Sequence, residues 1–158
     1  MTIPNIARDF ILECDLNPSI PLGSGPGDTK YNWISFAGGT WNATWGSGTI
    51  EHGGHDYQFV LPDLSAKATT QYLLKTSDED PAYIEIQSDG WIKGPLDVMQ
   101  SLNNASTRDD VDPSSYYFRL MVSMNTGDER YNHVNTSLWV ASARRMTGKV
   151  VFEAYIVG

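Results

Sequence analysis

The chain is poor in basic residues and has no long apolar run. Of its 158 residues, 11 are lysine or arginine and 19 are aspartate or glutamate, which gives a formal net charge of −8. This charge repels nucleic-acid phosphates and anionic lipid. No stretch approaches the ~20 apolar residues of a membrane span, and the first residues lack the pattern of a secretory signal. We therefore expect a cytoplasmic protein that binds neither nucleic acid nor membrane.

Cysteine and histidine are also scarce. The single cysteine, Cys14, excludes an internal disulfide and is expected to be a small buried residue. His52 and His55 flank two glycines, which is typical of a hairpin turn, and only His133 remains as a further ligand. Zinc sites need three or four convergent ligands. The glycine-rich residues 23–27 lead toward a strand and not into a phosphate-binding helix. We predict no metal and no cofactor.

Short apolar or alternating runs rich in β-branched and aromatic residues recur along the chain, separated by glycine, asparagine, aspartate and proline. We predict strands at 8–16, 30–37, 39–45, 47–52, 56–61, 66–76, 81–88, 115–125, 136–144 and 149–157. The pattern favours an all-β fold, a single antiparallel β-barrel of about eight to ten strands, because closure removes exposed strand edges. One domain is expected over 1–158, with its core at about 8–157.

Residues 95–102 form the one predicted helix. A proline stands at a first-turn position, and Leu96, Met99 and Leu102 share one face. This helix is expected to plug or flank one barrel end. The segments 17–29 and 103–115 are predicted to be irregular, mobile loops, either of which could act as a lid.

Two carboxylates stand on predicted strands. Successive side chains of a strand point to opposite faces, so Asp56 shares a face with Gln58, and Glu85 shares one with Tyr83 and Gln87. Each carboxylate could face water, and Asp56 could bind turn amides. In the lumen of a barrel, desolvation would raise the pKa of such a carboxyl and make it an acid near neutral pH. The sequence alone does not choose the face.

Aromatic residues are abundant, with five tryptophans and eight tyrosines. Each alone is expected to pack in the core or at a barrel rim. Together they exceed what a small barrel needs for filling, which favours a pocket for a planar or prenylated ligand.

The order of several motifs resembles a known family. These motifs are Leu22-Gly23, Pro26-Gly27, Gly38-Gly39-Thr40-Trp41, Gly53-Gly54-His55-Asp56-Tyr57-Gln58, Tyr72 with Thr76 and Asp78, Gly90, Gly94-Pro95, Tyr117-Phe118-Arg119, Thr126-Gly127-Asp128, Tyr131, Asn135 and Tyr155. In this order they resemble the domain of unknown function 3237 family over roughly residues 8–157.

The resemblance implies an antiparallel barrel with a central pocket lined in part by Asp56, Gln58, Tyr72 and Asn135. Most of the family has no assigned activity. Some fungal relatives are associated with cyclisation of aromatic polyketides, including closure of a cyclic ether on a prenylated phenol. Relatives often have an aromatic residue where this chain has Glu85, which would add a second carboxylate to the pocket.

We therefore expect a cofactor-free cyclase or isomerase that acts on a small aromatic or prenylated molecule. Asp56 or Glu85 would be the acid, and the other carboxylate or Tyr72 the base. The expected substrate-binding residues are Trp41, Gln58, Tyr83, Arg119, Asn135 and Trp139. A non-catalytic barrel that carries a similar metabolite is the alternative, and Arg119 could instead form a surface ion pair. A purely structural or protein-binding module is a further alternative. A homodimer through barrel edges or exposed aromatic residues is also compatible with the sequence.

Overall fold

The computed structural model describes residues 1–158, which form ten strands, one α-helix and four 3₁₀ segments. The strands are β1 (Ile6–Leu16), β2 (Ile20–Ser24), β3 (Lys30–Ala43), β4 (Ser47–Ile50), β5 (His55–Val60), β6 (Ala66–Thr76), β7 (Tyr83–Lys93), β8 (Tyr117–Asn125), β9 (Trp139–Met146) and β10 (Lys149–Val157). The helical segments are η1 (Pro26–Asp28), α1 (Leu96–Asn103), η2 (Arg108–Asp110), η3 (Pro113–Ser115) and η4 (Glu129–Thr136).

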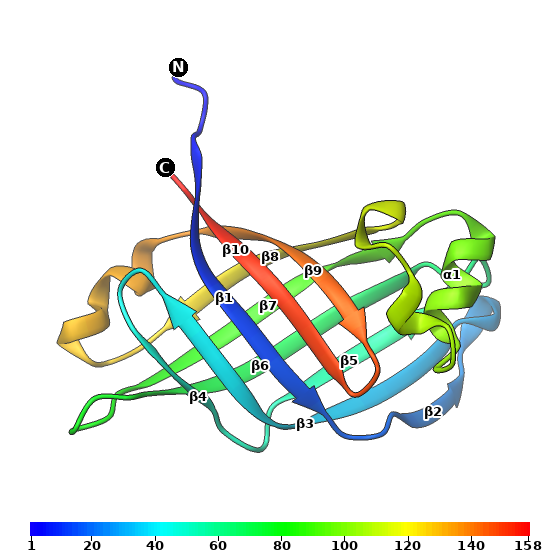
Figure 1. Ribbon diagram of the computed structural model, residues 1–158, viewed down its shortest axis with the longest axis horizontal. Helices are drawn as coiled ribbons and strands as arrows, with labels where there is room; N and C mark the ends of the chain where they lie inside the picture. The colour runs from blue at the N-terminus through cyan, green and yellow to red at the C-terminus, as the bar shows by residue number, and fades with distance from the viewer.

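Antiparallel pairing closes the strands into a barrel (Figure 1). The order runs β1-β10-β9-β8-β7-β6, continues through β4 and β5 to β3, and returns to β1. β4 and β5 share one position, because each pairs with β3 on one side and with β6 on the other. The closed barrel therefore has eight strand positions, and β2 extends from β3 outside the circuit. The predicted all-β antiparallel barrel is confirmed.

Inward side chains fill most of the lumen and alternate with outward ones. In β8 the inward row is Phe118, Leu120, Val122 and Met124, each at most 5% exposed. Rows from the neighbouring strands join them in one continuous hydrophobic core. Burying each such side chain contributes about 1.5–3 kcal/mol. The lumen is thus a packed core along most of its length.

β3 continues through Gly38 and Gly39 as one strand, where the sequence analysis predicted two. Both glycines have positive φ, +140° and +139°. A Cβ atom on Gly39 would lie 2.1 Å from the carbonyl oxygen of Glu13 in β1. The glycines therefore let β3 bend and approach β1 closely without ending, which is why the predicted break at this point is wrong.

The segment 17–29, predicted to be irregular, contains β2 and η1. β2 pairs with the first part of β3, and all of its residues are exposed. The segment 103–115 contains η2 and η3 and is attached to the end of β9. Asp109 makes this attachment, because its carbonyl oxygen accepts from Nη2 of Arg144 at 3.1 Å and its Oδ1 from the backbone N–H of Thr147 at 2.7 Å.

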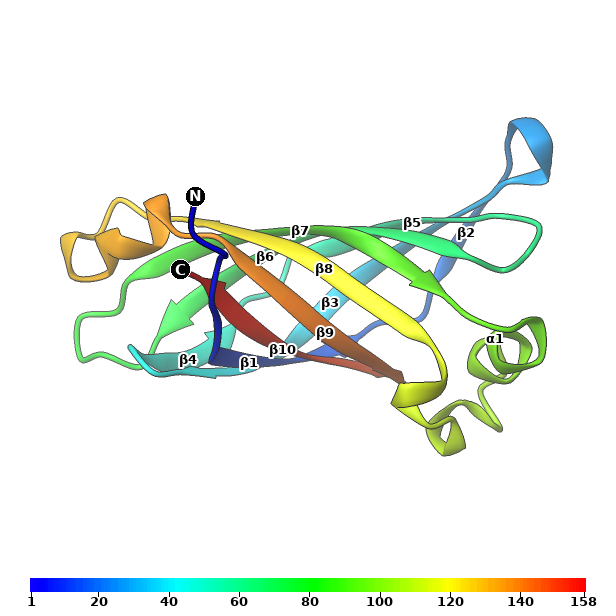
Figure 2. The same ribbon diagram turned by 90° about the horizontal axis from the view of Figure 1, so that it is seen from above.

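The predicted helix is confirmed as α1, which begins directly after Pro95. Met99 and Leu102 are each 1% exposed, whereas Leu96, on the predicted apolar face, is 56% exposed. Figure 2 shows α1 at the end of the barrel where β7 ends and β8 begins. Its last residue, Asn103, accepts a hydrogen bond through Oδ1 from Nη1 of Arg145 in β9 at 2.9 Å. The helix therefore flanks this end of the lumen.

A buried carboxylate fixes the opposite end of the barrel. A bulge in β1 turns Asp9 inward. Its carboxylate accepts hydrogen bonds from Oγ1 of Thr44 at 2.6 Å, Nε1 of Trp45 at 3.0 Å and Nε1 of Trp139 at 2.6 Å. Burial acts to raise the pKa of Asp9, but the three donors together hold it below its usual value. The ionised group therefore joins β1, the turn after β3 and β9.

The single cysteine, Cys14, is buried in β1 and free, as predicted. Burial raises the pKa of its thiol to about 12, so the thiol stays protonated and has little nucleophilic character. Among the helical segments, none combines the length and the apolarity needed to cross a bilayer.

Candidate functional site

A small cavity remains in the lumen at the end near α1. Its volume is about 30 Å³, which is room for roughly two water molecules. Its polar lining consists of Asp56, Gln58, Thr70, Tyr72 and Arg145. The rest of its wall is apolar: Leu16, Ile34, Phe36, Ala68, Ile92, Phe118, Leu120 and Val150.

Asp56 reaches this cavity because the alternation of β5 turns it inward together with Gln58. Its Oδ1 accepts a hydrogen bond from the backbone N–H of Thr69 at 3.2 Å. Burial raises the pKa of the Asp56 carboxyl to about 7, although the Thr69 bond and the charge of Arg145 act to lower it. Near neutral pH the carboxyl is present in both forms. It can therefore give or take a proton, as general acid–base chemistry requires.

Gln58 is 4% exposed, yet its side-chain amide has no hydrogen-bond partner in the protein. The amide atoms are not sealed off from solvent, because the one buried side-chain atom without a partner is Nε of Arg144. The amide lines the cavity, so its donor and acceptor are free for a bound molecule. This arrangement fits a recognition role.

Tyr72 lies on β6 and is 2% exposed. Its ring stacks on Phe36, with 4.5 Å between the ring centroids and 15° between the planes. Burial raises the pKa of its phenol well above the usual value, so the hydroxyl stays protonated. Tyr72 can donate a hydrogen bond into the cavity. Its predicted alternative role as proton acceptor does not fit this environment.

Arg145, which the sequence analysis missed, completes the polar lining. On β9 the residues Trp139, Ala141 and Ala143 face inward, and the same alternation brings Arg145 to the lumen. Burial lowers the pKa of its guanidinium to about 10, so the group still carries its charge at neutral pH. The alternation of inward and outward residues could have revealed Arg145 in the sequence, but the predicted strand ended one residue earlier, at 144.

Glu85 lies outside the barrel, contrary to the expectation that it would share the pocket with Asp56. Ile84 and Ile86 on either side are fully buried and define the inward face of β7. Glu85 Oε1 accepts hydrogen bonds from Nε2 of Gln87 at 2.7 Å and Nε2 of Gln71 at 2.8 Å. These bonds hold the pKa of Glu85 below its usual value. The predicted pair of carboxylates in the lumen is therefore wrong.

Two other predicted binding residues also lie on the outer surface. Tyr83 is 50% exposed and shares the outward face of β7 with Glu85. Arg119 points outward from β8, with its guanidinium carbon 5.4 Å from the centre of the Tyr117 ring and Nη1 donating to the carbonyl of Phe118 at 3.0 Å. Neither side chain reaches the lumen cavity, and Arg119 has no acidic partner there or on the surface.

The remaining predicted residues lie at the barrel end opposite α1. Trp41 is buried and its Nε1 donates to the carbonyl oxygen of Lys75 at 3.2 Å, while Trp139 is bound to Asp9. Asn135 in η4 closes a turn, since its Oδ1 accepts from the N–H of Thr126 at 2.8 Å. These side chains have structural partners and do not line the cavity.

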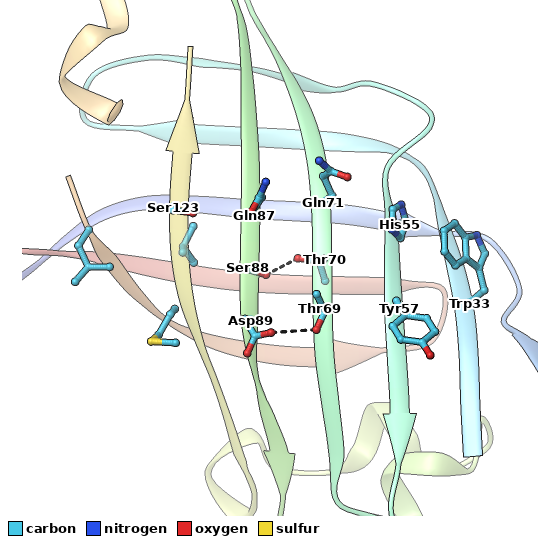
Figure 3. A pocket seen from close by; sticks show the side chains of 13 residues that line it. Trp33, His55, Tyr57, Thr69, Thr70, Gln71, Gln87, Ser88, Asp89 and Ser123 are labelled. Carbon is cyan, nitrogen blue, oxygen red and sulfur yellow. Dashed lines mark hydrogen bonds between the residues drawn. The ribbon is translucent and has the colours of Figure 1, made fainter. Parts of the chain in front are cut away.

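A larger hollow lies on the outer face of β3 and β5 to β8 (Figure 3), with a volume of about 700 Å³. Along one side, the ring of His55 stacks on Trp33 with 4.1 Å between the centroids. Its one carboxylate, Asp89, is already bound to Lys67 at 3.2 Å and to Oγ1 of Thr69 at 3.1 Å. This hollow is open and its charges are paired, so the smaller lumen cavity is the better candidate for chemistry.

Comparisons with known proteins agree with the fold. A family described as protein of unknown function (DUF3237) matches over residues 4–157. A UPF0311 protein of Bradyrhizobium diazoefficiens is 31% identical over 104 residues, which is 66% of this chain and 65% of that protein. A second, from Rhodopseudomonas palustris, is 29% identical over 111 residues, or 70% and 69% of the two chains. The matched stretch thus spans about two thirds of these relatives.

Solved structures cover the chain more fully. A β-barrel-like protein from Acinetobacter baumannii is 27% identical with a TM-score of 0.83, covering 100% of this chain and 98% of that one. A conserved protein of unknown function from Rhodopseudomonas palustris is 23% identical with a TM-score of 0.88, covering 100% and 99%. An enzyme from Penicillium herquei is 18% identical with a TM-score of 0.72, covering 100% and 97%. The latter two similarities concern the fold alone.

Proposed function

Because the chain belongs to the family described as protein of unknown function (DUF3237), whose description names no activity, we propose a function from the site itself. The protein is a cofactor-independent cyclase or isomerase that acts on a small aromatic or prenylated polyketide by proton transfer at Asp56. The observation that carries this proposal is a carboxyl with a pKa of about 7 in a largely apolar cavity that also presents the Gln58 amide, the Tyr72 hydroxyl and the Arg145 guanidinium. A structural carboxylate such as Asp9 has all of its donors in place and a lowered pKa.

Intramolecular hydroalkoxylation, which forms a cyclic ether, illustrates the proton transfers. The protonated Asp56 carboxyl gives its proton to one carbon of the substrate alkene, and the phenol oxygen forms a bond to the neighbouring carbon. The phenol proton then passes to the Asp56 carboxylate, which restores the starting state. All atoms of the substrate stay in the product, so no oxidant, reductant or second substrate is consumed. One titratable carboxyl is therefore sufficient.

The other polar groups of the cavity would hold the substrate. The hydroxyl of Tyr72 and the amide of Gln58 can bind its oxygens, and apolar side chains such as Ile34 and Phe118 exclude water from the reacting carbons. The fold is known to support catalysis in one case, because the similar barrel from Penicillium herquei is described as an enzyme. Its description names no reaction, so the similarity supports catalysis by this fold and not a particular reaction.

Entry of such a substrate requires movement of the cavity wall. The cavity has about 30 Å³ of free space, whereas pockets for drug-sized ligands measure about 300–1,000 Å³. We expect residues 96–115, from α1 through η3, to move outward, because this segment flanks the end of the lumen next to the cavity. The hydrogen bonds that hold it there, such as Arg145 to Asn103 and Thr147 to Asp109, would have to break. The movement would open the end of the lumen at which Asp56 lies.

The direct test is Asp56→Asn, assayed with prenylated phenols and analysed by chiral chromatography. General acid–base assistance accounts for roughly 10²- to 10⁴-fold of rate, so we expect a loss of turnover in that range with substrate affinity largely kept. Asp89→Asn on the outer face is the matched control and should keep full turnover. Unchanged turnover in Asp56→Asn would show that the carboxyl does not transfer the proton.

A non-catalytic barrel that binds or carries the same kind of metabolite is the second candidate. The outward position of Glu85 favours it, because the cavity then holds a single carboxyl where the catalytic hypothesis had expected two. The two candidates differ in one measurement. A carrier binds the metabolite with similar affinity before and after Asp56→Asn and forms no product beyond the uncatalysed reaction.

The predicted homodimer is kept as a proposal for the outer face of the barrel. Met121 is 62% exposed and Leu138 is 50% exposed there, beside Trp91 at 38%. Sedimentation analysis of the wild type and of Met121→Lys measures whether this face joins two copies. A monomer at all concentrations rejects the proposal. The cytoplasmic location is likewise an expectation from the sequence.

A further inference from the structure

Arg145 is a half-buried cation that lines the lumen cavity and has no anionic partner. No carboxylate lies within ion-pair distance of its guanidinium, although Asp56 lines the same cavity. Its one side-chain hydrogen bond goes to the neutral amide oxygen of Asn103 at 2.9 Å. A guanidinium carries five N–H donors in a planar fork. The remaining donors therefore have no acceptor in the protein.

The missing partner does not reflect a shortage of acids. The chain has 19 acidic residues against 11 basic ones. On the surface, Arg8 pairs with Glu153 at 3.0 Å and Arg130 with Asp128 at 2.7 Å. Surface pairs of this kind contribute about 0–1 kcal/mol, whereas a charge turned toward an apolar cavity gains more from a partner. Arg145 thus has no carboxylate partner, although an ion pair beside the apolar cavity would contribute more than one on the surface.

The groups around Arg145 add further donors to the same space. The hydroxyl of Tyr72 stays protonated, and the amide of Gln58 is unpaired. Asp56 is the only charged acceptor of the cavity, and as a protonated acid it is also a donor. The cavity therefore presents converging donors to whatever occupies it.

We propose that the lumen site binds its ligand through an organic oxyanion, a carboxylate, phenolate or enolate, held by the guanidinium of Arg145. A planar guanidinium binds two oxygens, or one oxygen through two N–H groups, better than a lysine does. The apolar wall, which includes Leu16, Ile34 and Phe118, suits the organic part of the ligand and not a hydrated inorganic ion. This inference rests on the proposed function only in using the same cavity for the substrate.

The charge of the site matches a monoanion. When Asp56 is protonated, Arg145 is the one charged group among the cavity residues, and a monoanionic ligand neutralises it. A phenolate held in this way is the nucleophile for ether closure, and Asp56 gives its proton to the alkene. In this case the phenol releases its proton to solvent on binding, and Asp56 takes a proton back from solvent after product formation. The substrate-binding role predicted for Arg119 thus passes to Arg145.

The test uses pairs of probes that have nearly the same shape but differ in charge: formate with formamide, acetate with acetamide, and benzoate with benzamide. Binding to the full-length protein is followed by NMR titration near pH 6.5. We expect each carboxylate to bind at least tenfold more tightly than its amide. The largest pair that binds also measures how far the cavity opens.

Arg145→Met should abolish the preference, and Arg145→Lys should keep part of it because the charge remains. Arg119→Met on the outer face is the matched control and should behave as the wild type. Equal affinity for acid and amide, an unchanged preference in Arg145→Met, or no binding by any probe would each overturn the inference. The Arg145→Lys result decides the matter if Arg145→Met does not fold.

The proposed function and this inference fail in different ways. If carboxylate binding depends on Arg145 while Asp56→Asn retains turnover, the oxyanion site stands and acid–base catalysis by Asp56 is rejected. If turnover requires Asp56 but no probe pair shows a preference, acid–base catalysis by Asp56 stands and the oxyanion site is rejected.

Discussion

Replacement of Asp56 by asparagine should stabilise the fold at alkaline pH. Folding raises the pKa of the Asp56 carboxyl from 3.8 to about 7. At about 1.4 kcal/mol per pH unit, a rise of about three units corresponds to ~4 kcal/mol. Between pH 4 and 7 the folded protein holds a proton that the unfolded chain releases. The wild type therefore loses up to ~4 kcal/mol of unfolding free energy as the pH rises through this window.

Asparagine carries no charge at any of these pH values and can still accept the Thr69 hydrogen bond. We expect Asp56→Asn and the wild type to be similar in stability near pH 4. At pH 8 the variant should be more stable by up to ~4 kcal/mol. Urea unfolding at pH 4, 5, 6, 7 and 8 measures the difference, with Asp89→Asn as the control that should show no such trend.

The result that refutes this reasoning is a difference between Asp56→Asn and the wild type that does not change with pH. A wild type that gains stability relative to the variant between pH 4 and 7 would contradict it further, since the carboxylate would then be stabilised by the fold. Either outcome would place the ionised form of Asp56 in contact with solvent or with Arg145. A group of that kind is a poor acid at neutral pH.

Three further substitutions test other parts of the structure. Asp9→Asn puts an amide N–H against the indole donor of Trp139 and should lower the unfolding free energy by about 3 kcal/mol in urea, with no change in m-value; a loss below 1 kcal/mol contradicts the triple hydrogen bond. Gly39→Ala places a Cβ atom against the carbonyl of Glu13 at positive φ and should cost about 3 kcal/mol or more, and a variant as stable as the wild type refutes the close approach. Glu85→Gln should keep turnover and ligand affinity within twofold, because the side chain lies outside; a tenfold loss would return this residue to the site.

The sequence was informative where local patterns determine the structure. The predicted strands 66–76 and 149–157 coincide with β6 and β10, because alternation and bounding turns define both ends. The pair Gly38 and Gly39 was ambiguous, since a glycine with positive φ serves a turn as well as a bend within a strand. Only the contact with β1, which is distant in sequence, determines which of the two occurs. Arg145 was not predicted because the ends of a strand are the least well-defined part of the alternating sequence pattern.

The face of each strand was harder to predict than the strand itself. Alternation divides β7 into the rows of Ile84 and Glu85, and in a barrel whose lumen is packed with hydrocarbon the isoleucine row faces inward. The same rule applied to β5 predicts that Tyr57 and Phe59 face inward and that Asp56 faces solvent. β5 does the opposite, so hydrophobicity alone gives the wrong face for this one strand.

The inverted face of β5 is itself an argument for a functional site. A shift of register by one residue would exchange the two rows, burying Tyr57 and Phe59 and releasing Asp56 and Gln58 to water. The observed register instead turns the Gln58 amide and a carboxyl whose pKa is raised to about 7 toward the lumen, and the raised pKa corresponds to a cost of about 4 kcal/mol for the ionised carboxyl. Outward aromatic contacts, such as Phe59 with Trp91 at 5.7 Å between the centroids, offset part of it. A fold that keeps such a cost beside the unpaired guanidinium of Arg145 is explained by a ligand that pairs these groups, because sequences depart from their local rules mainly at functional sites.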